Sequence, residues 1–384
     1  MSRFLFVVPP LAGHINPAAA VAAELTARGH RVAWAGVPEA VRQAAGADVE
    51  LYPCPVPADV RRPPGARGAE ALRFLWEDFL VPLAEAMTPG TRRAIRDFRP
   101  DAVVADQQTL AGALAAERAG VPWATSATTP AGLGGSLATL PKVEAWVGAQ
   151  TAGLRARFGD PAATHDPCVS PDLVLVYTIP ELAGRPVPAP GVRFVGPALP
   201  STRPAPDFPW ARLDPDRDTV LITLGTVNSD VGARFLGECV AAVRQRAERL
   251  QAVVADPGGV LAGVGDDTVL VLPRIPQLAL LPQASAVICH AGHNTVTESL
   301  WHGVPLVVAP IRDDQPFVAE QVTAAGAAVR VRFGRADRIR VGAALDAVLD
   351  GPHHWDAARR LRGRLRAAGG ARAAAGHLEA LAAR

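Results

Sequence analysis

The chain has 384 residues, enough for two domains of ordinary size, and 49% of them are hydrophobic, so sizeable cores can be buried. Its formal net charge of +2 provides no global basic field for nucleic acid. The four cysteines form neither a CxxC pair nor a cluster with zinc spacing, so we expect no metal site. Apolar windows of about eighteen residues are all interrupted, so we expect a cytoplasmic protein without a membrane span.

Short apolar runs alternate with helical patterns in the first half, which is typical of βαβ units around a parallel sheet. Asn16 as N-cap and Pro17 at the first helical position set the expected start of the first helix. The pattern predicts strands over residues 4–8, 31–35, 102–105 and 123–126, and helices over residues 17–27, 67–98, 110–119 and 143–157.

A proline-rich stretch over residues 183–217 predicts an interdomain linker, after which the strand and helix rhythm restarts. We therefore expect an α/β protein with two doubly wound, Rossmann-like domains that face each other across a cleft. The expected parts are domains over residues 1–199 and 218–365, a linker over 200–217, and a C-terminal helix over 366–384 that packs back toward the first domain.

The segment after the predicted strand at residues 286–289 is unusually polar. A strand, a turn of small residues and a helix point backbone N–H groups at an anion, and the helix dipole adds to this. Glu298 lies one helical turn beyond Asn294, where its carboxylate suits the two hydroxyls of a ribose. A helix N-cap explains any one of these residues, but not their combination: His290, Gly292, His293, Asn294, Thr295 and Glu298.

Three further loops complete the expected ligand-binding wall. Asp314 and Gln315 follow a strand and offer groups that suit sugar hydroxyls. Gly225 and Thr226 follow the strand ending at Leu224 and offer a backbone N–H and a hydroxyl to a diphosphate. Arg274 and Ile275 follow the strand over residues 269–272, where backbone groups can read a base edge.

In the first half, His14 lies between the first strand and the first helix. A helix N-terminus disfavours a charged imidazole, and a general base must be neutral. Asp106 closes the strand over residues 102–105, and parallel strands end at the same edge of a sheet. We therefore expect Asp106 to hydrogen-bond and orient His14. A helix-capping histidine and a loop carboxylate remain the alternatives for each residue alone.

These residues together resemble family 1 glycosyltransferases of the GT-B fold, most closely the bacterial enzymes that glycosylate carotenoids and related small molecules. The resemblance covers nearly the whole chain. It is carried by residues 13–17, Val195-Gly196-Pro197, Leu224-Gly225-Thr226, residues 290–295 and Asp314-Gln315-Pro316.

The resemblance implies an inverting, metal-independent glycosyltransferase of hexosyltransferase type, whose first domain binds the acceptor and whose second binds a nucleotide sugar. His14 is then the base and Asp106 balances the imidazolium. Glu298 favours UDP over dTDP slightly, because a deoxyribose offers it one hydroxyl fewer. The implied donor-binding residues are Gly225, Thr226, Arg274, Ile275, His290, Gly292, His293, Asn294, Thr295, Glu298, Asp314 and Gln315.

Three positions depart from common forms of the family. Arg274 replaces an aromatic that stacks on the base, although a guanidinium plane can also stack. His293 replaces a tryptophan or a small residue and puts contacts near the donor sugar in doubt. Val318 replaces an asparagine that often follows the Asp-Gln pair. None of the three removes the base or the diphosphate-binding residues.

The acceptor is expected to be a small lipophilic aglycone, such as a polyketide, a terpenoid or another natural product of antibiotic biosynthesis. This expectation rests on apolar side chains in the first domain, for which ordinary core packing is the alternative: Phe74, Trp76, Phe79, Leu133 and Trp146. Attack through oxygen and attack through carbon both stay open, and the chain is expected to be a monomer or a homodimer.

Two other functions stay open. A nucleotide-sugar epimerase or hydrolase on the same scaffold would need carboxylates near the sugar. A non-catalytic partner that activates another glycosyltransferase would not need an intact base, which His14, Asp106 and His290 argue against.

Overall fold

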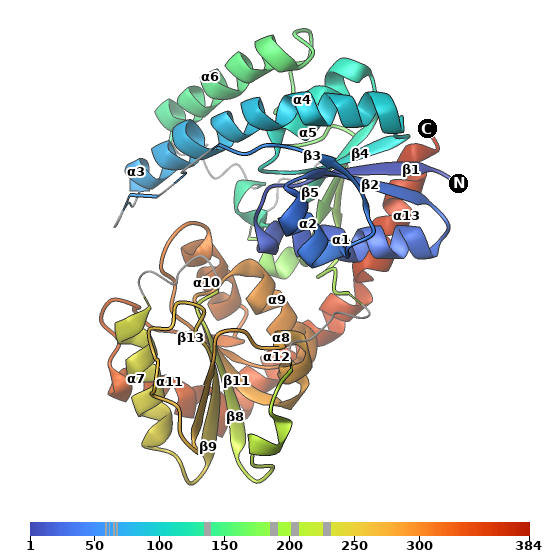
Figure 1. The fold of residues 1–384 in the computed structure, drawn as a ribbon. Coiled ribbons are helices and arrows are strands. Elements are labelled where there is room, and N and C mark those ends of the chain that lie inside the picture. The colour runs from blue at the N-terminus through green and yellow to red at the C-terminus, as the bar shows by residue number, and fades with distance from the viewer. Residues whose placement is uncertain are drawn as a thin grey trace. The chain divides into compact units, whose positions relative to one another are not determined.

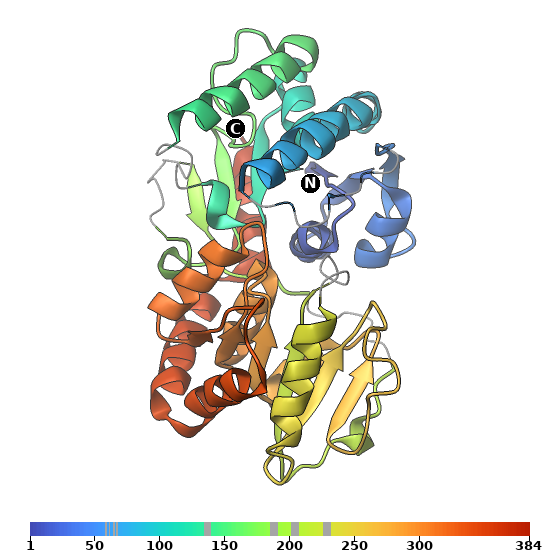
Figure 2. The same cartoon turned by 90° about the vertical axis from the view of Figure 1, so that its left-hand side faces the viewer.

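The computed structural model of the chain describes residues 1–57, 60, 62, 63, 66, 68–133, 140–184, 191–200, 207–225 and 232–384. The chain forms two compact units (Figure 1). Unit 1 contains Met1–Pro180, Gly184–Ser201 and Ala368–Arg384, and unit 2 contains Glu181–Ala183 and Thr202–Ala367. Both chain ends therefore belong to unit 1 (Figure 2). Among the helices of the described ranges, none combines the length and the apolar character needed to cross a bilayer.

Unit 1 is built on a seven-stranded parallel sheet of order β3-β2-β1-β4-β5-β6-β7. The chain runs outward from β1 in one direction and from β4 in the other, so the switch point of this doubly wound sheet lies between β1 and β4. The strands are β1 (Arg3–Val7), β2 (Arg31–Gly36), β3 (Glu50–Pro53), β4 (Ala102–Asp106), β5 (Trp123–Ala127), β6 (Leu173–Val176) and β7 (Val192–Phe194).

Successive side chains of β1 point to opposite faces of this sheet, and different helices cover the two faces. Phe4 and Phe6 pack with α1 and α13, whereas Leu5 and Val7 pack with α4 and α5 (Figure 1). An outer helix, α6, packs over α4 and α5. The helices of unit 1 are α1 (Ala12–Ala27), α2 (Pro38–Ala45), α3 (Gly68–Arg73), η1 (Phe74–Leu80), α4 (Val81–Phe98), α5 (Leu110–Ala119), η2 (Pro130–Gly132), α6 (Pro141–Phe158) and α13 (Gly370–Ala382).

The start of the first helix differs from the prediction. The helix begins at Ala12 rather than after Asn16, and Pro17 lies inside it. Its first hydrogen bonds run from the N–H groups of His14 and Ile15 to the carbonyl of Leu11. Burial of the apolar face of this helix against the sheet therefore outweighs the preference for Asn16 as N-cap. It also outweighs the cost of the backbone N–H that Pro17 lacks. As a result, His14 lies in the first helical turn rather than in a loop.

The helix predicted over residues 67–98 is present over residues 68–98 as α3, η1 and α4 in direct succession, with η1 a π-helical segment, and residue 67 lies outside the described residues. One further prediction for unit 1 was wrong in part. The stretch expected to be linker contains β7, which pairs with β6 as a short edge strand. Edge strands tolerate nearby prolines, because one side of the strand needs no ladder hydrogen bonds.

Polar contacts hold the C-terminal helix α13 against the residues that follow α1 and precede β1. The Glu379 carboxylate accepts from Nη1 of Arg28 at 2.8 Å and lies 2.9 Å from Nε2 of His30. Nδ1 of His30 accepts the backbone N–H of Ser2 at 3.0 Å. These contacts attach the end of the chain to its beginning.

The Val195-Gly196-Pro197 motif has a structural role in this same unit. The N–H of Gly370 donates to the carbonyl of Val195 at 2.6 Å. A side chain on Gly370 would meet the carbonyl oxygen of Pro197 at 2.9 Å, so only glycine allows this approach.

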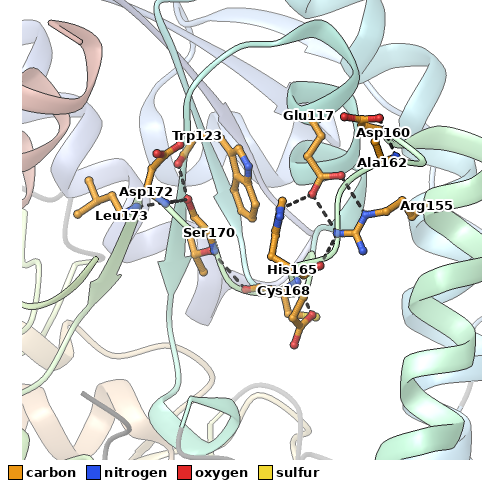
Figure 3. A network of polar contacts seen from close by, with 12 residues as sticks. Glu117, Trp123, Arg155, Asp160, Ala162, His165, Cys168, Ser170, Asp172 and Leu173 are labelled. Carbon is orange, nitrogen blue, oxygen red and sulfur yellow. Dashed lines mark hydrogen bonds and ion pairs between the residues drawn. The ribbon is translucent and has the colours of Figure 1, made fainter. Parts of the chain in front are cut away.

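A buried ionic cluster holds the connection between α6 and β6 against α5 (Figure 3). Glu117 on α5 pairs with Arg155 on α6 and with Nε2 of His165, and the Arg155 guanidinium also donates to the carbonyl of His165 at 2.6 Å. Further along the same connection, Ser170 Oγ donates to the carbonyl of Trp123 at 2.6 Å. The connection is therefore held by charge and hydrogen bonds at both ends.

Unit 2 repeats the architecture with a six-stranded parallel sheet of order β10-β9-β8-β11-β12-β13 and a switch point between β8 and β11. Helices α7 and α11 cover one face, and Figure 2 shows α7, in yellow, along this sheet. The short helix η3 (Pro180–Leu182) begins at the last residue of the first segment of unit 1 and continues into unit 2. The other elements of unit 2 are η4 (Trp210–Arg212), β8 (Asp218–Thr223), α7 (Ala233–Arg244), β9 (Leu250–Ala255), β10 (Val269–Leu272), α8 (Gln277–Leu280), η5 (Leu281–Gln283), β11 (Ala284–Cys289), α9 (His293–His302), β12 (Leu306–Val308), α10 (Gln315–Ala324), β13 (Ala328–Arg330), α11 (Arg338–Asp350) and α12 (Pro352–Ala367).

Candidate functional site

The switch point of unit 1 brings His14 and Asp106 together. Nδ1 of His14 lies 2.9 Å and 3.0 Å from the two carboxylate oxygens of Asp106. Asp106 ends β4, and β4 pairs with β1, which leads into the helix that carries His14. The contact expected from parallel strand ends is therefore present.

A third side chain joins this pair. The hydroxyl of Thr128, which directly follows β5, lies 2.7 Å from Nδ1 of His14 and donates to Oδ2 of Asp106 at 3.3 Å. The backbone N–H of Gln108 donates to Oδ1 of Asp106 at 2.9 Å. The Asp106 side chain is fully buried and that of His14 is 16% exposed.

The proton positions follow from the chemistry of these groups. An ionised carboxylate only accepts hydrogen bonds, so the proton between Asp106 and His14 belongs to Nδ1 of the imidazole. In the neutral ring, Nε2 then carries the lone pair. Histidine held in this way presents Nε2 as a base, with Asp106 fixing the tautomer and the ring orientation.

A fully buried phenol lies near this group. The hydroxyls of Tyr177 and Ser126 are 3.1 Å apart. Burial raises the pKa of Tyr177, and the charge of Asp106 raises it further, so Tyr177 stays protonated in the physiological range. The phenol therefore acts as a hydrogen-bonding group rather than as a second base.

The switch point of unit 2 holds the histidine of the polar segment. Gly225 follows β8 with a φ of +72°, and a side chain there would meet Cε1 of His290 at 2.8 Å. A side chain on Gly292 would meet Nε2 of the same ring at 2.3 Å. The His290 ring therefore lies between two glycines, and no other residue fits at either position without moving it.

His290 is buried and electrically neutral. Desolvation lowers its pKa to about 4, against an opposing effect of the nearby Asp314 carboxylate. Nδ1 of His290 is buried and has no hydrogen-bond partner among the residues that the structure describes. A buried polar nitrogen without a partner carries a desolvation cost, which a bound ligand can remove.

Helix α9 starts directly after this ring. Its N-cap is Gly292, which offers no side-chain acceptor, and the preceding Ala291 has a φ of +64°. His293 and Thr295 are buried in the first turn, together with a half-buried Asn294. The N-terminal N–H groups of α9 therefore lie beside His290 in a geometry that suits an anion.

Glu298, one turn further along α9, is oriented by Gln277. Nε2 of Gln277 donates to Oε2 of Glu298 at 2.5 Å, and Glu298 is only 9% exposed. Arg274 and Ile275 lie in the loop that leads from β10 to Gln277, the first residue of α8, and Arg274 is exposed to solvent. The structure thus brings the loop after β10 next to α9.

Asp314 and Gln315 lie at the start of α10. Oε1 of Gln315 accepts the backbone N–H groups of Ile311 and Arg312 at 2.9 Å and 3.0 Å. The side-chain oxygen of Gln315 therefore stabilises the loop before α10. Its side-chain amide nitrogen is the group that can donate to a ligand. Thr226 lies outside the described residues.

The five apolar residues expected to bind the acceptor are not gathered in one place. Trp76 is buried in the cluster between η1, α5 and α6, with Phe79 and Trp146 packed against it. Leu133 packs instead against a cluster of Ala127, Val174 and Val176. Phe74 is half-buried, with the guanidinium of Arg62 over its ring at 5.9 Å.

Thr128 and Gln277 were not among the residues predicted from the sequence. Thr128 carried a usable signal, because it follows a strand whose neighbour ends in Asp106. The sequence placed Gln277 only at the end of a predicted loop. Its hydrogen bond to Glu298 depends on the tertiary structure and has no local sequence signal.

Comparisons with known proteins identify the family of this chain. Residues 187–363 match the family model described as UDP-glucoronosyl and UDP-glucosyl transferase, and residues 12–126 match the glycosyltransferase family 28 N-terminal domain. The solved structure of the glycotransferase of kitacinnamycin has a TM-score of 0.84 and 27% identity, with 99% of each chain covered. The fold is therefore GT-B, and the chain is a glycosyltransferase.

Curated relatives match over almost the full length. The 4'-demethylrebeccamycin synthase of Lentzea aerocolonigenes is 31% identical, covering 94% of this chain and 95% of the relative. The demethyllactenocin mycarosyltransferase of Streptomyces fradiae is 29% identical, covering 99% and 87%. The chain belongs to family 1 of the glycosyltransferases, in its bacterial natural-product group.

Proposed function

We propose that this glycosyltransferase moves a sugar from a nucleotide diphosphate donor to a hydroxyl of a small lipophilic acceptor, with inversion at the anomeric carbon and His14 as general base. The observation that carries the proposal is the contact of 2.9 Å between Nδ1 of His14 and Asp106, which leaves Nε2 as the acceptor of a proton. A base presented in this way suits a transferase better than a non-catalytic activator.

The reaction is a single displacement. Nε2 of His14 takes the proton of the acceptor hydroxyl while its oxygen forms a bond to the anomeric carbon. The bond from that carbon to the diphosphate oxygen breaks, and the nucleoside diphosphate leaves with the electron pair. One displacement inverts the anomeric configuration. Asp106 stabilises the imidazolium that forms at His14, as a buried carboxylate does in related acid–base groups.

The donor diphosphate is proposed to bind in unit 2 at the N-terminus of α9. The neutral His290 ring donates to a phosphate oxygen, and its buried nitrogen without a described partner supports this role. Asn294 and Thr295 add donors in the first turn, and Gly225 allows close approach of the backbone. These groups compensate the charge that develops on the leaving diphosphate.

We propose that Glu298 binds the ribose and that Asp314 and the amide nitrogen of Gln315 bind the sugar. Gln277 holds one oxygen of Glu298, so the carboxylate has a fixed direction. A fixed carboxylate gains from two ribose hydroxyls, which favours UDP over dTDP. Arg274 supplies a guanidinium plane for the base.

The acceptor is proposed to be a natural-product aglycone, with attack through oxygen. The names of the relatives refer to rebeccamycin, lactenocin and kitacinnamycin chemistry, and this supports a small lipophilic acceptor for the present chain. In unit 1, Phe74 and Leu133 are the half-buried candidates for acceptor contact, whereas Trp76 is committed to the core.

The test is to incubate the enzyme with UDP-sugars and dTDP-sugars and a pool of aglycones, and to analyse the products by mass spectrometry. We expect glycosides from the wild type, only trace amounts from His14→Ala, and nucleotide binding that is nearly unchanged in that variant. His353→Ala, at an exposed position on α12, is the matched control and should keep full activity. Epimerised or hydrolysed donor without glycoside would overturn the transferase, and full turnover by His14→Ala would overturn the base.

A further inference from the structure

We infer that Thr128 is a positioning residue for the base: its hydroxyl completes the hydrogen bonding of the Asp106 carboxylate and fixes the ring of His14. This inference rests on the proposed role of His14. Thr128 Oγ1 lies 2.7 Å from Nδ1 of His14 and donates to Oδ2 of Asp106 at 3.3 Å.

The donors and acceptors of this group can be counted. Among the described residues, the Asp106 carboxylate faces three donors: the N–H at Nδ1 of His14, the backbone N–H of Gln108 and the hydroxyl of Thr128. With its own proton directed at Asp106, the Thr128 oxygen turns a lone pair toward the Nδ1 proton. Oxygen atoms thus surround that proton on two sides, and the ring has little freedom to turn.

Thr128 is itself held firmly. It is 4% exposed and follows β5, whose neighbour in the sheet is β4. The backbone N–H of Gln107 donates to the carbonyl of Ser126 at 3.1 Å, which joins the turn after Asp106 to the end of β5. Because the two strand ends are tied together, the hydroxyl cannot move away from the carboxylate without breaking this connection.

The consequence is specific to catalysis. Without the hydroxyl, Asp106 loses one of three donors while it must still stabilise a charged imidazolium. The ring also gains freedom to turn, because the Thr128 oxygen no longer faces Nδ1. Since a hydrogen bond to a charged group contributes about 1.5–3 kcal/mol, kcat should fall about ten- to a hundredfold. Binding of either substrate should not change, because Thr128 acts through His14.

The experiment compares Thr128→Val, which keeps the shape and removes the hydroxyl, with Thr128→Ser, which keeps the hydroxyl. We expect Thr128→Val to lose kcat about ten- to a hundredfold with unchanged KM for donor and acceptor, and Thr128→Ser to retain most of kcat. Thr128→Ala is a second variant without a hydroxyl, in case valine disturbs folding. Equal kcat in wild type and Thr128→Val, or equal losses in the Val and Ser variants, would overturn the inference.

A double variant separates positioning from a merely structural effect. In a His14→Ala background, Thr128→Val should cause no further loss of the residual rate, because the ring through which it acts is absent. A further loss of the same size would show that Thr128 acts independently of His14. If His14→Ala itself retained full turnover, the proposed base would fail first, which is distinguishable from failure of Thr128 alone.

Discussion

Nδ1 of His14 and Oδ1 of Asp106 lie 2.9 Å apart although 92 positions separate the two residues in the sequence. The contact exists because Asp106 ends β4 and His14 follows β1, the two central strands at the switch point of one sheet. Unit 2 uses the same position of its own sheet, where Gly225 follows β8 and His290 follows β11. The two candidate sites thus occupy equivalent places in two sheets of the same topology, where ligands of doubly wound folds bind.

Asp106→Asn tests the tautomer argument. The amide can present an N–H to Nδ1, which places the ring proton on Nε2 and removes the base. We expect kcat to fall by about four orders of magnitude, as the Asp→Asn change does in Ser-His-Asp triads, with nucleotide affinity unchanged. The measurement is steady-state kinetics with Asp97→Asn, an exposed position, as control. A kcat within a few-fold of wild type would show that Asp106 does not orient His14.

Gly292→Ala tests the position of the His290 ring. The added carbon would lie 2.3 Å from Nε2, so the ring must move, although the backbone φ of −63° suits alanine. We expect weaker binding of UDP and dTDP by about tenfold or more, measured by calorimetry. Gly237→Ala on α7, where nothing lies within 4 Å of the new carbon, is the matched control and should bind normally. Equal affinities in both variants would remove His290 from the diphosphate site.

The two sheets and the His14–Asp106 contact could be predicted from the sequence, because apolar runs and parallel strand ends follow simple periodic rules. The start of α1 could not, since burial of Ile15, Ala18 and Val21 against the sheet outweighed the cap signal at Asn16. The short strand β7 was hidden because a three-residue edge strand among prolines has no detectable alternation.

The side-chain environment of the site was less predictable. That Trp76 packs in a core cluster depends on α6, a helix far along the chain, and local hydrophobicity carries no such information. The hydrogen bonds from the backbone N–H groups of Ile311 and Arg312 to Oε1 of Gln315 depend on the turn that this loop makes. Residue types indicated the chemistry of the site, whereas tertiary contacts decided which atoms are left for a ligand.

Arg155→Met tests the buried ionic cluster. The side chains of Arg155 and Glu117 are 10% and 4% exposed, so removing the arginine leaves a buried carboxylate that contacts His165 but has lost its guanidinium partner (Figure 3). We expect the free energy of unfolding to fall by about 3 kcal/mol in urea titrations. Arg157→Met on the same helix removes an exposed pair with Glu85 and should cost less than about 1 kcal/mol. Equal losses would contradict a special role for the buried pair.

The pH dependence of stability tests the environment of His290. Burial lowers its pKa in the folded protein to about 4, whereas an unfolded histidine titrates near 6.5. Between these two values the unfolded chain binds the additional proton, so acidification favours unfolding. The contribution of His290 should therefore be absent near pH 7 and should lower the free energy of unfolding by about 3 kcal/mol as the pH falls to 4.

The measurement is urea unfolding of the nucleotide-free protein at several pH values between 7 and 4, for the wild type and for His290→Asn. Other groups titrate in this range, including His302 and His377, whose pKa values are also lowered by burial. Because both proteins contain these groups, the difference between the two pH profiles isolates His290. The wild type should lose more stability than the variant on acidification. Parallel profiles would mean that His290 is solvated, which would also weaken its proposed role as a neutral donor to the diphosphate.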